Sequence, residues 1–212
     1  MNSHVPGLQL NALLAEAGLE PLDQRTVSRL GDYISLYLRW NARLNLSAIR
    51  DEKGVISRHI IESIALASAL PQEIFTLLDF GSGAGLPGIP IALCCPQIAV
   101  TLAESQGKKA AFLEEAVRVL GIRATVHAAR AETLRAVFDC VVLRAVDKMP
   151  KAVAAAVRLV AAKGCLVLMT TISRLDNLKS AAGVDFSWTT KKQRFSATDR
   201  IIALGARRSP CV

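Results

Sequence analysis

The chain has 212 residues, of which 51% are hydrophobic and 21% are charged. This size and composition exclude two independent enzyme domains and long disordered regions, and they favour a single α/β unit with a modest extension. The first residues lack a basic segment followed by an apolar run and a cleavage site, so we expect no secretory signal and a cytoplasmic location without membrane attachment.

The positive charge is concentrated in the last third of the chain. The formal net charge is +8, and residues 148–212 hold 12 Lys or Arg against 3 Asp or Glu, whereas the earlier residues are close to neutral. A surface that binds a polyanion needs such an uneven field. Charge of this kind also serves solubility alone, so it suggests a nucleic-acid partner without establishing one.

The five cysteines, at positions 94, 95, 140, 165 and 211, form no C-x-x-C pair. This pattern argues against a disulfide framework and against a structural zinc site. We therefore expect reduced thiols in or near the core and no bound metal.

Residues 8–70 have the pattern of amphipathic helices. Apolar positions recur at spacings of three and four through 24–46 and again through 59–70, which is the period of a helix with one buried face. We assign residues 1–72 to a helical cap packed on a core of residues 73–212, and we expect Trp40 to be a core residue rather than a base-stacking platform.

From residue 74 the pattern changes to short apolar runs broken by glycine or charge. Runs at 74–80, 98–104, 124–128, 138–143 and 165–170 are typical of buried strands, and segments at about 87–95, 107–120 and 150–162 of helices. This alternation predicts a doubly wound, mostly parallel sheet. Two further strands, at roughly 186–195 and 199–205, predict an antiparallel hairpin at one edge.

The sequence DFGSGAGLPG follows the first predicted strand. Gly81, Gly83 and Gly85 allow a sharp turn and a close approach to a ligand, at the edge where open α/β sheets bind ligands. Asp79 closes the strand two positions before the first glycine. This D-x-G-x-G-x-G form is typical of S-adenosylmethionine sites, and a seven-stranded Rossmann-like methyltransferase fold follows from it.

A dinucleotide site is the alternative. Gly83, Gly85 and Gly88 fit the G-x-G-x-x-G pattern literally. Glu104 closes the second strand, where its carboxylate can accept hydrogen bonds from the ribose hydroxyls of either cofactor. Glu104 therefore predicts a nucleoside without choosing between the two.

No catalytic turn of an amine or carbon-5 methyltransferase follows the fourth strand. Neither a D/N-P-P-Y/F sequence nor a cysteine nucleophile is present there, because FDCVVLRAV ends the strand with Arg144 and places Cys140 inside it. A target atom that is already nucleophilic would need no such group, so we name no catalytic acid or base.

Six blocks of the sequence resemble one family, the bacterial small-subunit (16S) ribosomal RNA guanine-N(7) methyltransferases once called glucose-inhibited division protein B. The similarity covers most of the chain, from about residue 13 to residue 204, and the blocks stand in the family's order and spacing; they are RWNARLNLSAIRD (39–51), RHIIESI (58–64), DFGSGAGLPGIP (79–90), ESQGKKAAFLEE (104–115), ARAET (129–133) and LRAV (143–146). The resemblance implies S-adenosylmethionine as cofactor, ribosomal RNA or a ribosomal particle as partner, and methylation of a guanine in the decoding-region loop. We expect a monomer.

The resemblance also implies site residues. Carried over by position, the cofactor contacts are Gly81, Gly83, Gly85, Leu86, Glu104, Ala131, Glu132 and Arg144. Glu132 could instead stabilise its own helix terminus, and Arg144 could instead form a buried salt bridge.

Four arginines are candidates for RNA contact, namely Arg39, Arg43, Arg130 and Arg144. Arg39 and Arg43, one helical turn apart, could equally form a solvated face. His59 could act as a base, although a structural role fits an apolar helix better.

The chain departs from the family's pattern at two places. Glu62 stands where the family usually has Asp, and LMTTISR replaces a lysine-glycine pair near the end of the fifth strand, so Arg174 or Lys179 would have to contact RNA there. Three alternative functions outside the family also fit the sequence. They are a small-molecule methyltransferase, an NAD-dependent oxidoreductase and an RNA-binding protein without activity.

Overall fold

The computed structural model describes residues 6–193 and 199–208. Within these ranges seven strands form one sheet in the order β3-β2-β1-β4-β5-β7-β6. The strands are β1 (Thr76–Phe80), β2 (Ala99–Ala103), β3 (Ala124–His127), β4 (Phe138–Arg144), β5 (Val160–Thr171), β6 (Phe186–Lys192) and β7 (Arg200–Arg207). The first five strands are parallel, which confirms the predicted α/β class.

The last two strands form the expected hairpin, with one feature that sequence reasoning did not specify. β7 pairs antiparallel with both β5 and β6, so it lies between them and β6 forms the edge. Residues 194 and 195, included in the predicted sixth strand, lie outside the described residues.

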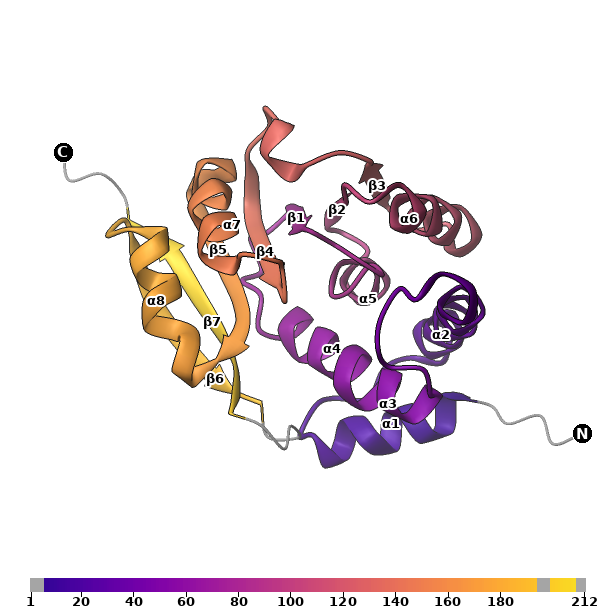
Figure 1. Cartoon of the computed structure of the whole chain (residues 1–212). Helices are drawn as coiled ribbons and strands as arrows, with labels where there is room; N and C mark the ends of the chain where they lie inside the picture. The colour runs from indigo at the N-terminus through magenta and orange to yellow at the C-terminus, as the bar shows by residue number, and fades with distance from the viewer. Residues whose placement is uncertain (1–5, 194–198, 209–212) are drawn as a thin grey trace, which may run out of the picture.

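Helices cover both faces of the sheet (Figure 1). One face is covered by α1 (Pro6–Glu16), α2 (Gln24–Leu44), α4 (Ile61–Ala67), α5 (Gly88–Cys94) and α6 (Gly107–Leu120); the other carries α7 (Met149–Ala156) and α8 (Ile172–Ala182). The helix α3 (Glu52–Val55) and the π-helical turn η1 (Ile56–Ile60) lead directly into α4. Two short 3-10 turns, η2 (Ala131–Thr133) and η3 (Val157–Leu159), complete the elements.

The N-terminal helices and the sheet share one hydrophobic cluster. Leu14 of α1, Tyr37 of α2, Leu77 of β1 and Ile202 of β7 all belong to it. Trp40 is partly buried and packs edge-on against Phe112 of α6 with ring centroids 5.6 Å apart, which agrees with the expected core packing. The helical segment is therefore packed into the core rather than attached at its surface.

Two predicted boundaries were wrong. The helix expected over 150–162 ends earlier, and β5 begins at Val160 rather than at 165. The helix α8, which follows β5 directly, was not predicted. The start of β5 was missed because Ala161, Ala162 and Lys163 favour helices. The helix α8 was missed because it buries only a narrow stripe of apolar side chains.

Candidate functional site

The glycine loop, residues 81–87, joins the carboxyl end of β1 to α5 and lies beside the ends of β2 and β4. The backbone N–H groups of Gly81 and Ser82 donate to the carbonyl of Ala103 at 3.0 and 2.9 Å. These hydrogen bonds tie the loop to the end of β2. They place it at the edge of the sheet where parallel α/β folds bind ligands.

The glycines of the loop have different surroundings. A Cβ built on Gly83, at φ +57°, meets nothing within 4 Å, whereas one on Gly85 would lie 2.4 Å from Ile89 Cδ1. Gly88 is equally confined, since its Cβ would lie 2.4 Å from Leu102 Cδ2. Gly83 therefore faces open space suited to a ligand, while Gly85 and Gly88 permit close packing of α5 against the sheet.

Gly81 has both a left-handed backbone and little room for a side chain. Its φ of +74° belongs to the left-handed region, and an added Cβ would lie 3.2 Å from Val146 Cγ2. Leu86, the fourth predicted contact in this loop, is only 7% exposed and packs in the cluster shared with the N-terminal helices.

Glu104, one residue beyond β2, connects its strand end to the glycine loop. Its Oε2 accepts a hydrogen bond from the Gly83 N–H at 2.9 Å, and its Oε1 accepts one from the Gln106 N–H at 2.7 Å. Each carboxylate oxygen has a second lone pair for a further donor. The carboxylate is thus held beside the open side of Gly83, as a ribose-binding group requires.

Asp79 has a structural role below the loop. Its carboxylate is buried and accepts the Gly88 N–H at 2.9 Å. Burial raises the pKa of Asp79 to about 7, although the bond from Gly88 opposes this rise. Asp79 therefore holds the start of α5.

Tyr33 supports the loop from the helical segment. Its hydroxyl, fully buried on α2, donates a 2.6 Å hydrogen bond to the Ala84 carbonyl. Burial raises the pKa of Tyr33 well above its usual value, so the hydroxyl remains a donor. Sequence reasoning missed this residue, because the contact joins positions 51 apart.

The ARAET segment lies after β3. Ala131 is buried in the short turn η2, Glu132 is partly buried, and Arg130 is exposed. The Glu132 carbonyl accepts a hydrogen bond from Arg158. Ala131 and Glu132 thus follow β3, which pairs with β2. Glu104 stands directly after β2.

Arg144, at the end of β4, lies in a buried network with residues of the α3–α4 segment. Its Nη2 contacts Glu62 Oε2 at 3.0 Å, the Arg58 carbonyl at 2.9 Å and His59 Nδ1 at 2.6 Å. Glu62 also accepts two hydrogen bonds from Nη1 of Arg200, at 2.8 and 3.0 Å. One carboxylate therefore holds two guanidinium groups.

The same network determines the state of His59. Burial, followed by the charge of Arg144, lowers the pKa of His59 to about 3. A neutral imidazole can accept the hydrogen bond from Arg144, and with this pKa it is a weak base. Its contacts agree with the expected structural role.

Arg39 and Arg43 are exposed on α2. They make no hydrogen bond or ion pair with the Arg144 network in the part of the chain that the structure describes. Arg174 is exposed in the first turn of α8, directly after β5, whereas Lys179 lies in the last turn of that helix. Arg174 is thus on the same sheet edge as Arg144.

Cys94, Cys95, Cys140 and Cys165 are free thiols, as expected. Cys211 lies outside the described residues. Within those residues no group of three or more His, Cys, Asp or Glu side chains is arranged to hold a metal ion. A search of the same residues found no helix both long and apolar enough to cross a membrane.

Known proteins match both the sequence and the fold. The ribosomal RNA small subunit methyltransferase G of Roseiflexus sp. (strain RS-1) is 42% identical over 135 residues, which cover 60% of this chain and 58% of that protein. Its namesake from Xanthomonas euvesicatoria pv. vesicatoria (strain 85-10) is 37% identical over 179 residues, 82% of each chain. The structure of a SAM-dependent O-methyltransferase from Thermotoga maritima superposes with a TM-score of 0.59 at 13% identity, covering 83% of this chain and 72% of that one, and shows the same fold.

A family model matches the same part of the chain. Residues 26–200 match the model of the GidB family, described as rRNA small subunit methyltransferase G. This range contains the glycine loop, Glu104 and the Arg144 network described above. The chain therefore belongs to the GidB family of rRNA small subunit methyltransferases.

Proposed function

We propose that this protein transfers a methyl group from S-adenosylmethionine to nitrogen 7 of a guanine in the decoding-region loop of small-subunit (16S) ribosomal RNA. The observation that supports the proposal most directly is the arrangement of Gly83 and Glu104. The backbone of Gly83 faces open space, and the buried carboxylate of Glu104 lies beside it. Family membership favours S-adenosylmethionine over a nicotinamide cofactor in this crevice.

The residues around the loop fit a nucleoside cofactor. Glu104 would accept hydrogen bonds from the ribose hydroxyls, while the backbone at Gly81, Gly83 and Gly85 would leave room for the rest of the molecule. Ala131 and Glu132, at the end of the next strand, would hold the adenine. Leu86 would contribute an apolar contact from the end of the loop.

Arg144 would orient either the methionine carboxylate or the guanine. Its hydrogen bonds to the α3–α4 segment use Nη2, and among the described residues no group accepts a hydrogen bond from Nη1. Its neighbour Glu62 fixes the plane of the guanidinium, which suits recognition of a planar acceptor. The same contacts agree with the buried salt bridge that the sequence also allowed.

The proposed reaction needs no general base. The cofactor supplies a methyl group bound to a positively charged sulfur. The lone pair of guanine nitrogen 7 forms the new bond to the methyl carbon while the carbon–sulfur bond breaks, and the positive charge moves to the base without transfer of a proton. Catalysis would rest on positioning and on the electrostatics of the pocket.

Contact with RNA would use the exposed arginines and the basic last third of the chain. Arg39, Arg43 and Arg130 are exposed and could bind phosphates. Arg174, at the carboxyl edge of β5, is better placed than Lys179 to replace the family's lysine. Such a substrate would place the enzyme in the cytoplasm.

The experiment compares ribosomal RNA from cells with and without this gene by mass mapping of nucleosides. Loss of one 7-methylguanosine from small-subunit RNA is expected, and an unchanged RNA would refute the proposal. Purified protein with labelled S-adenosylmethionine should restore the mark, whereas Gly83→Asp and Glu104→Ala should not. Undiminished cofactor binding in both variants would remove the site assignment.

A further inference from the structure

A second cavity, of about 500 Å³, lies between the N-terminal helices and the β6–β7 hairpin, away from the glycine loop. Leu19, Ala65 and Ile202 contribute apolar lining, and Lys191, Lys192 and Gln193 contribute polar lining. The volume falls in the range of about 300 to 1,000 Å³ that is usual for small-molecule sites. An apolar wall facing amide and ammonium groups suits a ligand that is itself part apolar and part anionic.

Gln193 supplies the second observation. The residue is only 7% exposed, and within the described residues no group accepts a hydrogen bond from its buried Nε2. Lys191 pairs with Ile202, and side chains two positions apart share a face, so Lys191 and Gln193 lie on the face that Ile202 presents to the cavity. A buried donor without an acceptor is costly, which indicates that a ligand atom completes this bond.

The cavity is connected to the cofactor crevice through the ion network. Ala65 follows Glu62 by three positions on α4, so both lie on one side of that helix. Glu62 binds Arg200 at the start of β7 and Arg144 at the end of β4. The network therefore runs along the carboxyl edge of the sheet from the crevice toward the cavity.

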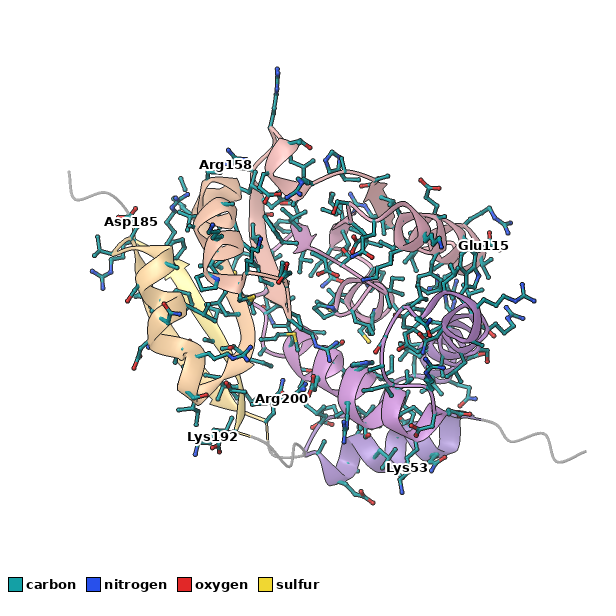
Figure 2. The ribbon with its side chains drawn as sticks, in the orientation of Figure 1. Lys53, Glu115, Arg158, Asp185, Lys192 and Arg200 are labelled. Carbon is teal, nitrogen blue, oxygen red and sulfur yellow. The ribbon has the colours of Figure 1, made fainter. Side chains whose placement is uncertain are left out.

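Cationic groups line the β6 side of the cavity. Lys191 and Lys192 are exposed, and the Arg200 side chain is 41% exposed. Figure 2 shows Lys192 and Arg200 at the same end of the hairpin, opposite to Asp185 and Arg158. The exposed carboxylates of Glu16 and Glu20 flank the lining residues 17–19, and Asp199 precedes Arg200, so an anion would be bound on the lysine side of the cavity.

From these observations we infer that the cavity binds one nucleotide of the RNA substrate, close to the methylated guanine. The base would lie against Leu19, Ala65 and Ile202, and a base carbonyl or ring nitrogen would accept the hydrogen bond from Gln193 Nε2. Lys191 and Lys192 would contact the adjoining phosphates. This inference rests on the proposed function, because it requires an RNA substrate.

The test measures the affinity of protein-free small-subunit ribosomal RNA for wild type and variants at two salt concentrations. Gln193→Leu keeps the side-chain volume and removes the donor, and it should weaken binding by about threefold to tenfold. Because that donor has no acceptor among the described residues, the variant's melting temperature should be unchanged or higher. Ala65→Met, which fills the cavity, should also weaken binding.

Lys191→Ala should weaken binding and lower the slope of log affinity against log salt by about one. Lys163→Ala is the matched control, since Lys163 is equally exposed but lies near the opposite end of β5; it should bind like wild type. Calorimetry with S-adenosylmethionine should give wild-type affinity for every variant.

The possible failures are distinguishable. If wild type neither binds nor methylates RNA, the proposed function fails and the inference fails with it. If wild type binds RNA and the Gln193, Ala65 and Lys191 variants match it, only the inference is overturned. Weakened binding to intact subunits with unchanged binding to protein-free RNA would also overturn it, because the cavity would then contact a ribosomal protein.

Discussion

The buried hydroxyl of Tyr33 on α2 donates a hydrogen bond to the carbonyl of Ala84 in the glycine loop, 51 residues away, at 2.6 Å. A helix outside the α/β alternation thus holds the segment that is proposed to carry the cofactor. The contact ties the geometry of the crevice to the packing of the N-terminal helices.

Tyr33→Phe should lower both stability and cofactor affinity. The Ala84 carbonyl would lose its partner in a buried place, at a cost of about 1 to 3 kcal/mol, and the loop would be less well positioned. Urea unfolding and calorimetry measure the two effects. Tyr37→Phe, which loses a 3.2 Å bond to the Ile49 carbonyl instead, should leave cofactor affinity close to wild type. Equal losses of affinity in both variants would contradict the role of Tyr33.

Alanine at Gly83 should mainly affect cofactor binding, whereas alanine at Gly85 should mainly affect the stability of the fold. Gly83→Ala places its methyl group in open space, so the protein should fold with a loss of about 1 kcal/mol from its left-handed backbone and bind cofactor poorly. Gly85→Ala would collide with Ile89 and Leu113 and should mainly destabilise the fold. Gly121→Ala controls for backbone strain, because Gly121 has φ +56°, open surroundings and a place at the end of α6. Normal cofactor binding by Gly83→Ala would count against the site.

Glu104→Gln should weaken cofactor binding by roughly tenfold or more while the protein remains folded. The amide retains one acceptor oxygen for the two backbone donors of Gly83 and Gln106, and it loses the charge that strengthens hydrogen bonds to ribose hydroxyls. Titration calorimetry reports the change. Glu115→Gln removes a surface ion pair with Arg118 and should bind cofactor like wild type, so a matching defect there would point to a general effect of charge.

Removal of Glu62 should be severe, because it leaves Arg144 buried without its counter-charge. A loss of about 3 to 5 kcal/mol is expected for Glu62→Ala, measured by urea unfolding. Glu62→Asp keeps the charge and should cost much less. If the two variants unfold alike, the ion pair contributes little and Arg144 must be held by other groups.

His59 should contribute to the loss of stability in acid. Its pKa is about 3 in the folded chain and about 6.5 when unfolded. A folded pKa below the unfolded value gives stability that is complete above pH 6.5 and is lost as the pH falls toward 3. The loss should be on the order of 2 kcal/mol between pH 6.5 and 4.5. Urea unfolding at both pH values should show a smaller difference for His59→Gln than for wild type, and an equal difference would refute the neutral, buried histidine.

The parts of the fold that could be predicted are those that depend on local pattern. Buried parallel strands such as β4 have continuous apolar runs, and the crossover helix α6 has a clear period. The start of β5 could not be predicted, because Ala161 to Lys163 have helix-forming side chains and lie at a register shift between Val160 and Cys165, which do pair with β4. The position of β7 between β5 and β6 depends on pairing that no periodicity encodes.

The same distinction applies to the candidate site. Gly83 and Glu104 could be predicted as candidates because a short motif and a strand end mark them. Glu62 was noted only as a departure from a family pattern, although it joins Arg144 and Arg200 across 82 and 138 positions. Contacts over such separations arise from tertiary packing, and a single sequence carries no signal for them.

The order of strands at the sheet edge affects how the chain can fold during synthesis. β6 leaves the ribosome before β7, the strand to which it is hydrogen-bonded, and Arg200 of β7 emerges long after Glu62, with which it forms an ion pair. Until residue 207 has been made, the growing chain has an incomplete sheet and lacks this second ion pair of Glu62. Commitment to the native state is therefore delayed until β7 has emerged, and a shielding chaperone would be of use to the nascent chain before that point.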